Sequence, residues 1–254
     1  MEFYKKFTRR LRSDGLISLT RSVPRFCIDR VRELENRRFD ARLGTQTASI
    51  GSLKRTYNDT LGPHGGENQG HQPIQGAVFR RIMRDFKRIA SPSQFVFVDI
   101  GSGRGRAVLM AAENQFKYST GIEFSKEMYS CAEENARSFR LRANNAGPVE
   151  FKWMDAAEYS FPRENIVCYL YNPFGPQVMD LVLANLKDSL EKYPREVYMV
   201  YRNPLLASRI AQWDFLKPVV HRRSFIIYKN RLHEAIGGAS ESNSATSWKE
   251  PNAH

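Results

Sequence analysis

The sequence predicts an α/β protein with a Rossmann-like, doubly wound sheet, preceded by a helical N-terminal extension. Residues 95–100 are a short β-branched and aromatic run, as expected of a strand that is covered on both faces. A glycine-rich turn over 101–105 follows, and then a helical pattern over 106–114. Further strand-like segments follow as far as residue 230, with helix-like segments over 176–190 and 205–212, which is typical of an α/β fold.

Each element is expected from its own pattern of apolar residues. Strands are expected over 95–100, 118–124, 149–154, 166–171, 196–201, 215–220 and 224–230. Helices are expected over 1–12, 24–39, 75–88, 106–114, 176–190 and 205–212. The chain is accordingly divided into a basic helical extension over 1–43, a loop or lid segment over 44–76, a sheet domain over 77–234 and a disordered tail over 235–254.

Composition excludes several classes of protein and leaves others open. The three cysteines are far apart and no cluster has metal-ligand spacing, so we expect neither a disulfide framework nor a metal site. The charged N-terminus does not resemble a signal peptide and no apolar stretch has the length of a membrane span, so we expect a cytoplasmic protein. The net charge of +12 fits solvated helix faces, but also contact with nucleic acid, acidic lipid or an acidic protein. The sequence leaves the oligomeric state open.

The turn over 101–105 has the features of a loop that holds a nucleotide-type cofactor. Gly101, Gly103 and Gly105 allow a sharp turn and a close approach of a ligand to the backbone. The helix that follows directs its free amide groups toward the same place. The glycines follow the pattern G-x-G-x-G, and Arg106 stands where a dinucleotide-binding loop requires its third glycine. Asp99 lies two residues before the first glycine.

Polar residues stand at the ends of the next three predicted strands. The second strand ends in Glu123-Phe124, where a carboxylate can hold a ribose diol. The third ends before Asp155-Ala156, and the fourth before Asn172-Pro173-Phe174-Gly175. The ordered set of four strand ends is more specific than any one of these motifs.

Together these residues resemble the class I S-adenosylmethionine-dependent methyltransferases over about 75–230. Asp-Ile-Gly-Ser-Gly-Arg-Gly resembles their first motif, and Asn-Pro-Phe-Gly resembles the [Asn/Asp/Ser]-Pro-Pro-[Tyr/Phe] motif of those that act on amino groups. Within the class, the chain is most similar to small bacterial proteins distantly related to the non-SET histone lysine methyltransferases. The resemblance implies a seven-stranded sheet, mostly parallel with one antiparallel strand, and S-adenosylmethionine as the cofactor.

The resemblance also assigns expected roles to single residues. Glu123 is expected at the ribose hydroxyls and Asp155 at the adenine amino group. Gln75 is a candidate because His71-Gln72-Pro73-Ile74-Gln75 loosely resembles a motif that precedes the first strand in some protein-lysine methyltransferases. The complete set of expected cofactor-binding residues is Asp99, Gly101, Ser102, Gly103, Gly105, Glu123, Phe124, Asp155, Ala156, Asn172 and Gln75.

The predicted catalytic residues are Asn172, Pro173 and Phe174. The Asn172 side-chain oxygen and the Pro173 carbonyl can accept hydrogen bonds from an amine and orient its lone pair, while Phe174 can form an apolar wall beside the cation. We therefore expect methyl transfer to an amino nitrogen, with a protein side chain as the favoured acceptor. A nucleic-acid base, approached through the basic N-terminal region, and a non-catalytic S-adenosylmethionine-binding scaffold are the alternatives.

Overall fold

The computed structural model describes residue 30, residues 33–48 and residues 73–231. In this part of the chain, seven strands form one sheet in the order β3-β2-β1-β4-β5-β7-β6. The strands are β1 (Val96–Ile100), β2 (Ser119–Glu123), β3 (Val149–Trp153), β4 (Ile166–Leu170), β5 (Val197–Arg202), β6 (Leu216–Arg222) and β7 (Phe225–Asn230). Strands β1 to β5 are parallel, and β7 is antiparallel to both of its neighbours. The predicted mostly parallel sheet with one antiparallel strand is confirmed.

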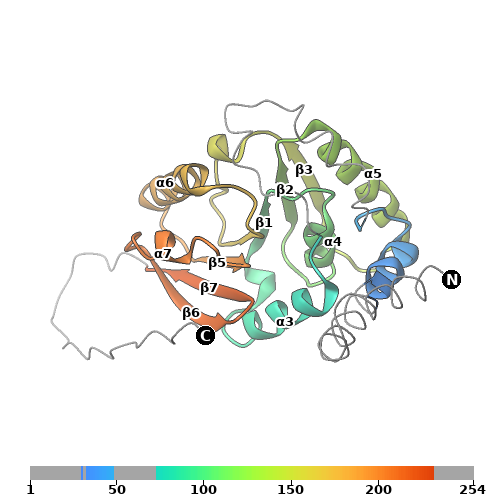
Figure 1. Cartoon of the computed structure of the whole chain (residues 1–254), viewed down its shortest axis with the longest axis horizontal. Helices are drawn as coiled ribbons and strands as arrows, with labels where there is room; N and C mark the ends of the chain where they lie inside the picture. Colours follow the sequence, from blue (N-terminus) through green and yellow to red (C-terminus); the bar gives the residue numbers. More distant parts are fainter. Residues whose placement is uncertain (1–29, 31–32, 49–72, 232–254) are drawn as a thin grey trace, which may run out of the picture.

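Helices cover both faces of this sheet (Figure 1). They are α3 (Gly76–Phe86), α4 (Arg106–Ala112), α5 (Lys126–Arg142), α6 (Pro176–Lys192) and the short α7 (Ala207–Ile210), with single 3₁₀ turns η2 (Pro92–Gln94) and η3 (Ala156–Glu158). A further helix covers residues 33–43 and lies beside α5 in the view of Figure 1. None of the described helices is long and apolar enough to cross a membrane.

Alternation along β1 divides the core between the two faces. Val96, Val98 and Ile100 pack in one cluster with buried residues of α6. Phe97 points to the other face, where its ring centroid lies 6.1 Å from that of Phe79 on α3. Because successive side chains of a strand point to opposite faces, the wholly apolar run of the sequence produces a strand buried on both sides.

Helix α5 lacks a strong apolar stripe and was not predicted. Its buried face includes Met128, Ala132, Ala136 and Phe139, so two of its contacts are alanines. Its first turn is capped by Ser125, whose hydroxyl accepts from the Met128 N–H at 3.4 Å. The predicted helix over 1–12, most of the predicted loop segment over 44–76 and the predicted tail over 235–254 lie outside the described residues.

Candidate active site

A cavity opens at the carboxyl ends of the parallel strands, which is the usual binding edge of a doubly wound sheet. Its lining comes from the loop after β1, the ends of β2, β3 and β4, the start of α4 and two residues before α3. Of the predicted site residues, it includes Asp99, Gly101, Ser102, Gly103, Glu123, Phe124, Asp155, Ala156, Pro173 and Phe174. The structure thus brings ten residues that are scattered over the sequence into one cavity.

The loop after β1 is possible only because glycine occupies its turning points. Gly101 has φ +79° and Gly105 has φ +84°, both in the left-handed region that side chains disfavour. A Cβ on Gly101 would overlap the ring of Pro173, and one on Gly105 would overlap the ring of Phe151. Gly101 therefore allows the ends of β1 and β4 to approach each other. Gly105 is not among the described residues that line the cavity. It lies directly before α4, where the absence of a side chain leaves room for the ring of Phe151.

Glu123 fixes the glycine loop from inside the cavity. The Gly103 N–H donates to its Oε2 at 2.8 Å, and the Ser125 N–H donates to its Oε1 at 2.9 Å. The residue is only 4% exposed. Burial raises the pKa of the Glu123 carboxyl, while the backbone hydrogen bonds oppose this rise. Each carboxylate oxygen can accept more than one hydrogen bond, so acceptor capacity remains for ligand hydroxyl groups.

Asp99 is a second buried carboxyl group that faces the same cavity. Burial, and then the neighbouring charge of Glu123, raises the pKa of Asp99 well above its ordinary value. At pH values between the pKa of the unfolded chain and that of the folded chain, Asp99 is therefore protonated in the folded chain and ionised in the unfolded one. A cationic ligand group at this point would stabilise the ionised form of Asp99 and lower its pKa again.

The end of β3 supplies a polar group beside an apolar surface. Asp155 caps η3, since its Oδ1 accepts from the Ala157 N–H at 2.8 Å. The remaining carboxylate oxygen is available for a ligand amino group. Apolar lining residues surround this part of the cavity and suit a flat base: Ile122, Phe124, Met128, Met154 and Ala156.

At the end of β4, Asn172 differs from its two neighbours in its relation to the cavity. Asn172 is 8% exposed and is not among the described residues that line the cavity. Its Oδ1 accepts from the hydroxyl of Tyr201 at 3.0 Å, and its backbone has φ +46°, a left-handed conformation that asparagine tolerates better than most residues. In this conformation the Asn172 oxygen accepts from Tyr201, and its contact with an acceptor amine stays a prediction. The adjacent Pro173 and Phe174 do line the cavity.

The predicted role of Gln75 also lacks support. Gln75 is the residue before α3 and is not among the described lining residues, whereas Pro73 and Ile74 are. His64 and His71, which flank the preceding loop in the sequence, lie outside the described residues. Within the described residues there is no group of three or more metal-ligating side chains.

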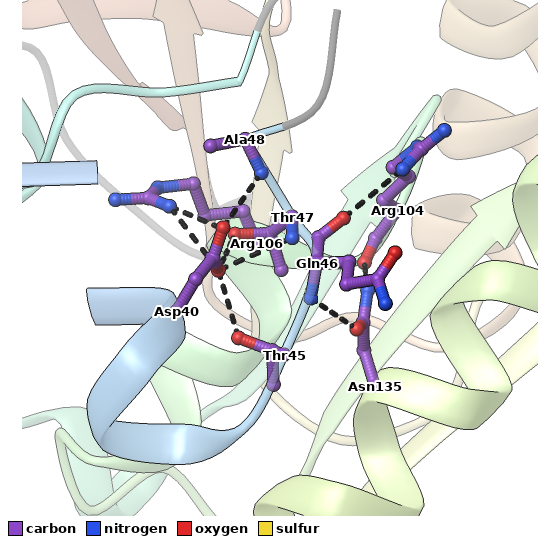
Figure 2. A network of polar contacts seen from close by, with 8 residues as sticks. All are labelled: Asp40, Thr45, Gln46, Thr47, Ala48, Arg104, Arg106 and Asn135. Carbon is purple, nitrogen blue, oxygen red and sulfur yellow. Dashed lines mark hydrogen bonds and ion pairs between the residues drawn. The ribbon is translucent and has the colours of Figure 1, made fainter. Parts of the chain in front are cut away.

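Sequence reasoning missed Tyr169, Tyr171 and Arg106, which all line the cavity. The Tyr169 hydroxyl is buried and has no hydrogen-bond partner among the described residues. Arg106 extends from the start of α4 to the segment before residue 49, where it meets Thr47 and Asp40 (Figure 2). The sequence did offer one indication that Arg106 lies at the site, because Arg106 stands where the dinucleotide-binding pattern has its third glycine. The tyrosines gave no signal, because a buried strand is expected to carry such residues.

Comparison with known families assigns this site to a class of enzyme. Residues 76–185 match the family model of the histone methylation protein DOT1. The matched segment contains the glycine loop and the ends of β2, β3 and β4, which together form most of the cavity. The chain is a class I S-adenosylmethionine-dependent methyltransferase. The predicted class and cofactor are thereby confirmed.

Solved structures with a similar course include other methyltransferases at low identity. The RNA methyltransferase of Salinibacter ruber, in complex with S-adenosyl-L-homocysteine, is 20% identical, with a TM-score of 0.41 over 67% of this chain and 100% of that one. The magnesium protoporphyrin IX methyltransferase of Synechocystis PCC 6803, with bound S-adenosylmethionine, is 12% identical, with a TM-score of 0.46 over 78% and 93%. A dimethyladenosine transferase of Plasmodium falciparum is 16% identical, with a TM-score of 0.46 over 65% and 64%. Such distant similarity says nothing about the acceptor of this enzyme. A search of curated proteins found no match.

The cavity of the methyltransferase fits its cofactor group by group. Glu123 has acceptor capacity for the ribose hydroxyls, and Asp155 faces an apolar surface that suits adenine. The carboxyl group of Asp99 suits the cationic end of the molecule. When bound, S-adenosylmethionine supplies a methyl group on a sulfonium centre, and the residues at the end of β4 must present the acceptor in line with that bond.

Proposed function

We propose that this methyltransferase acts on an amino nitrogen, and that the acceptor is a side chain of another protein. The observation that carries the proposal is the aromatic wall of the cavity at the end of β4, by which we mean the three aromatic residues Tyr169, Tyr171 and Phe174 that line the cavity together with Pro173. Aromatic faces suit the methylene chain of a long amine, and they favour the ammonium group that develops on methyl transfer. The similarity to a family of histone methylation proteins supports the same acceptor class.

Two groups on this wall can orient the amine. The Tyr169 hydroxyl is unpartnered, and burial raises its pKa well above the ordinary value, so it remains a neutral donor and acceptor. The Pro173 carbonyl is a further acceptor candidate at the same end. In this proposal Tyr169 takes over the orienting role that the sequence suggested for Asn172. Phe174 adds an apolar aromatic surface to the lining of the same cavity.

A nucleic-acid base is the second candidate, and a basic face of the enzyme favours it. Exposed basic residues lie on and after α3 (Arg80, Arg81, Arg84, Lys87 and Arg88) and at the end of β6 and in the turn that follows it (His221, Arg222 and Arg223). Arg222 joins the two groups, because its Nε donates to the buried Asp85 of α3 at 2.9 Å. Such a face suits phosphate contacts, which would make binding strongly dependent on salt.

One labelling experiment separates the two acceptor classes. The enzyme is incubated with S-adenosylmethionine labelled in its methyl group, and with the protein and RNA fractions of a cell lysate separately. Label in the protein fraction that acid hydrolysis releases as a methylated amino acid supports the first proposal. Label confined to RNA overturns it and supports the second.

Variants of two buried tyrosines then test the orienting role. Tyr169→Phe should lower turnover on the labelled acceptor by about tenfold, since an orienting hydrogen bond is lost. Tyr228→Phe is the matched control, because Tyr228 is equally buried on β7 and does not line the described cavity. Equal rates for the two variants would remove Tyr169 from the mechanism.

A further inference from the structure

Residues 40–48 run from the last turn of the helix over 33–43 into the segment that follows and fold around one carboxylate, and we call them the N-terminal strap. Oδ1 of Asp40 accepts from the Thr45 hydroxyl at 2.8 Å, from the Thr47 hydroxyl at 2.6 Å and from the Thr47 N–H at 3.1 Å. Its Oδ2 accepts from the Ala48 N–H at 3.0 Å. Figure 2 shows Asp40 at the centre of these contacts. The strap is therefore ordered by its own side chains before any ligand is considered.

The strap is bound to the outside of the cofactor loop by a closed ring of hydrogen bonds (Figure 2). Arg104 donates to the Gln46 carbonyl at 3.2 Å, and the Gln46 N–H donates to Asn135 Oδ1 at 2.7 Å. The Asn135 amide then donates to the Arg104 carbonyl at 3.0 Å. Asn135 lies on α5, so the ring joins the strap, the loop and a helix of the sheet domain. Movement of the strap would therefore disturb the loop at Arg104.

Arg106 connects the strap with the interior of the cavity. One terminal nitrogen of its guanidinium donates to the Thr47 hydroxyl at 2.8 Å and lies 3.7 Å from Asp40 Oδ1. Its guanidinium carbon lies 4.4 Å from the centre of the Phe39 ring. The side chain is only 2% exposed, and its Nε and other terminal nitrogen have no hydrogen-bond partner among the described residues. Buried donors of a cation are rarely left without an acceptor, so this edge of Arg106 points to a missing anionic group.

We propose that Arg106 binds the carboxylate of the methionyl end of S-adenosylmethionine, and that the N-terminal strap holds Arg106 in position to do so. Arg106 lines the cavity beside Gly103 and Asp99, at the end where the amino-acid part of the cofactor is expected. The Nε and terminal N–H groups of an arginine form two parallel donors that match the two oxygens of a carboxylate. Strap and cofactor thus contact opposite edges of one guanidinium group.

This shared residue makes strap docking and cofactor binding reciprocal. If the docked strap raises the affinity for the cofactor, the bound cofactor must stabilise the docked strap by the same factor. The strap then sets cofactor affinity without touching the cofactor. The inference rests on the identity of the cofactor and not on that of the acceptor, so it can fail while the proposed acceptor stands.

Calorimetric titration with two probes tests the carboxylate contact. The probes are S-adenosylhomocysteine and its decarboxylated analogue, which keeps the adenosine, the thioether and the amino group. Arg106→Gln should weaken binding of S-adenosylhomocysteine at least tenfold and change binding of the analogue by no more than about threefold. Equal losses for both probes, or no loss for either, would overturn the proposal. If Arg106→Gln does not fold, Arg106→Lys is the second variant: it keeps the charge but loses the paired donors, so it should weaken S-adenosylhomocysteine more than the analogue, by a smaller factor than glutamine would.

A double-mutant cycle tests the role of the strap. Thr47→Val removes the hydroxyl that Arg106 contacts, and it should raise the Kd for S-adenosylhomocysteine several-fold in the wild-type background. In the Arg106→Gln background the same change should have no further effect. Thr45→Val is the matched comparison, because Thr45 also binds Asp40 but does not contact Arg106, and its effect should be smaller. Additive losses from Thr47→Val and Arg106→Gln would show that the strap acts independently and would refute the coupling.

Discussion

Replacing Glu123 by glutamine tests whether this carboxylate both shapes the glycine loop and binds the ribose. The two carboxylate oxygens accept from Gly103 and Ser125, and a glutamine can offer an oxygen to only one of these donors. The other N–H is left buried beside an amide NH₂ group. An unsatisfied buried donor costs about 1–3 kcal/mol, so we expect the free energy of unfolding without ligand to fall by about that amount.

The same substitution should lower the affinity for the cofactor by a predictable factor. A hydrogen bond to a charged group contributes about 1.5–3 kcal/mol and a neutral one about 0.5–1.5 kcal/mol. The loss per ribose contact is therefore about 1–1.5 kcal/mol, which corresponds to roughly a tenfold increase in Kd. Glu123→Ala should lose more, because it removes every acceptor at once.

Calorimetry with S-adenosylhomocysteine and thermal unfolding without ligand measure the two effects separately. Glu150→Gln is a suitable control, because Glu150 is an exposed carboxylate on the neighbouring strand β3 and the same charge is lost. The control should bind within about twofold of wild type, as expected of an exposed charge. A folded Glu123→Gln protein with wild-type affinity would refute the assignment of Glu123 to the ribose.

Three further predictions concern the same cavity. Burial raises the pKa of Asp99 above that of the unfolded chain, so the free energy of unfolding without cofactor should fall as pH rises from about 4 toward the folded pKa. Asp99→Asn should flatten this decline, measured by thermal unfolding between about pH 5 and pH 8, and an unchanged profile would contradict the assignment. Asn172→Gly and Tyr201→Phe should lower turnover to similar extents, because the Asn172 oxygen serves Tyr201; a loss of about 100-fold for Asn172→Gly alone would restore the direct contact with the acceptor. Gly101→Ala should lower the free energy of unfolding by more than about 2 kcal/mol, since it combines a left-handed backbone with overlap on Pro173, and denaturant unfolding near the wild-type midpoint would disprove this.

The sequence indicated which residues meet at the cavity on the side expected to hold the cofactor, because their positions depend on local chain geometry. A buried strand followed by closely spaced glycines can only turn sharply, and a polar residue that ends a parallel strand must lie at the same edge of the sheet. Asp99, Glu123 and Asp155 are placed by these two rules alone.

The acceptor half was harder to predict because its side chains depend on tertiary contacts. Asn172 has the expected residue type at the expected place, yet the hydroxyl of Tyr201, from the neighbouring strand β5, takes its oxygen. Tyr169 belongs to an apolar run that gives no sign of an unpartnered hydroxyl. Such pairings arise between strands that are distant in the sequence, and no periodicity encodes them.

The strap was missed for a related reason. Its order comes from hydrogen bonds between side chains and backbone around Asp40, in a segment without an apolar repeat. Arginine and asparagine at positions 104, 106 and 135 look like ordinary surface residues in the sequence. Only the fold shows that Arg104 and Arg106 are buried against the strap.

The glycine loop is consequently held by hydrogen bonds from two sides, and these bonds reduce the conformational entropy that the loop must lose when the cofactor binds. Glu123 holds the Gly103 amide from inside the cavity, while Arg104 and Arg106 tie the residues on either side of Gly105 to the strap. Glycines lower the barrier to turning but raise the entropy that must be lost when the loop is ordered. Because hydrogen bonds on both sides order the loop during folding, the cofactor need not supply that free energy when it binds. Variants on either side should therefore weaken the cofactor even where they do not touch it. If Thr47→Val acts by loosening the same loop that Glu123 holds, the double variant with Glu123→Gln should lose less affinity than the sum of the two single losses, and additive losses would contradict this.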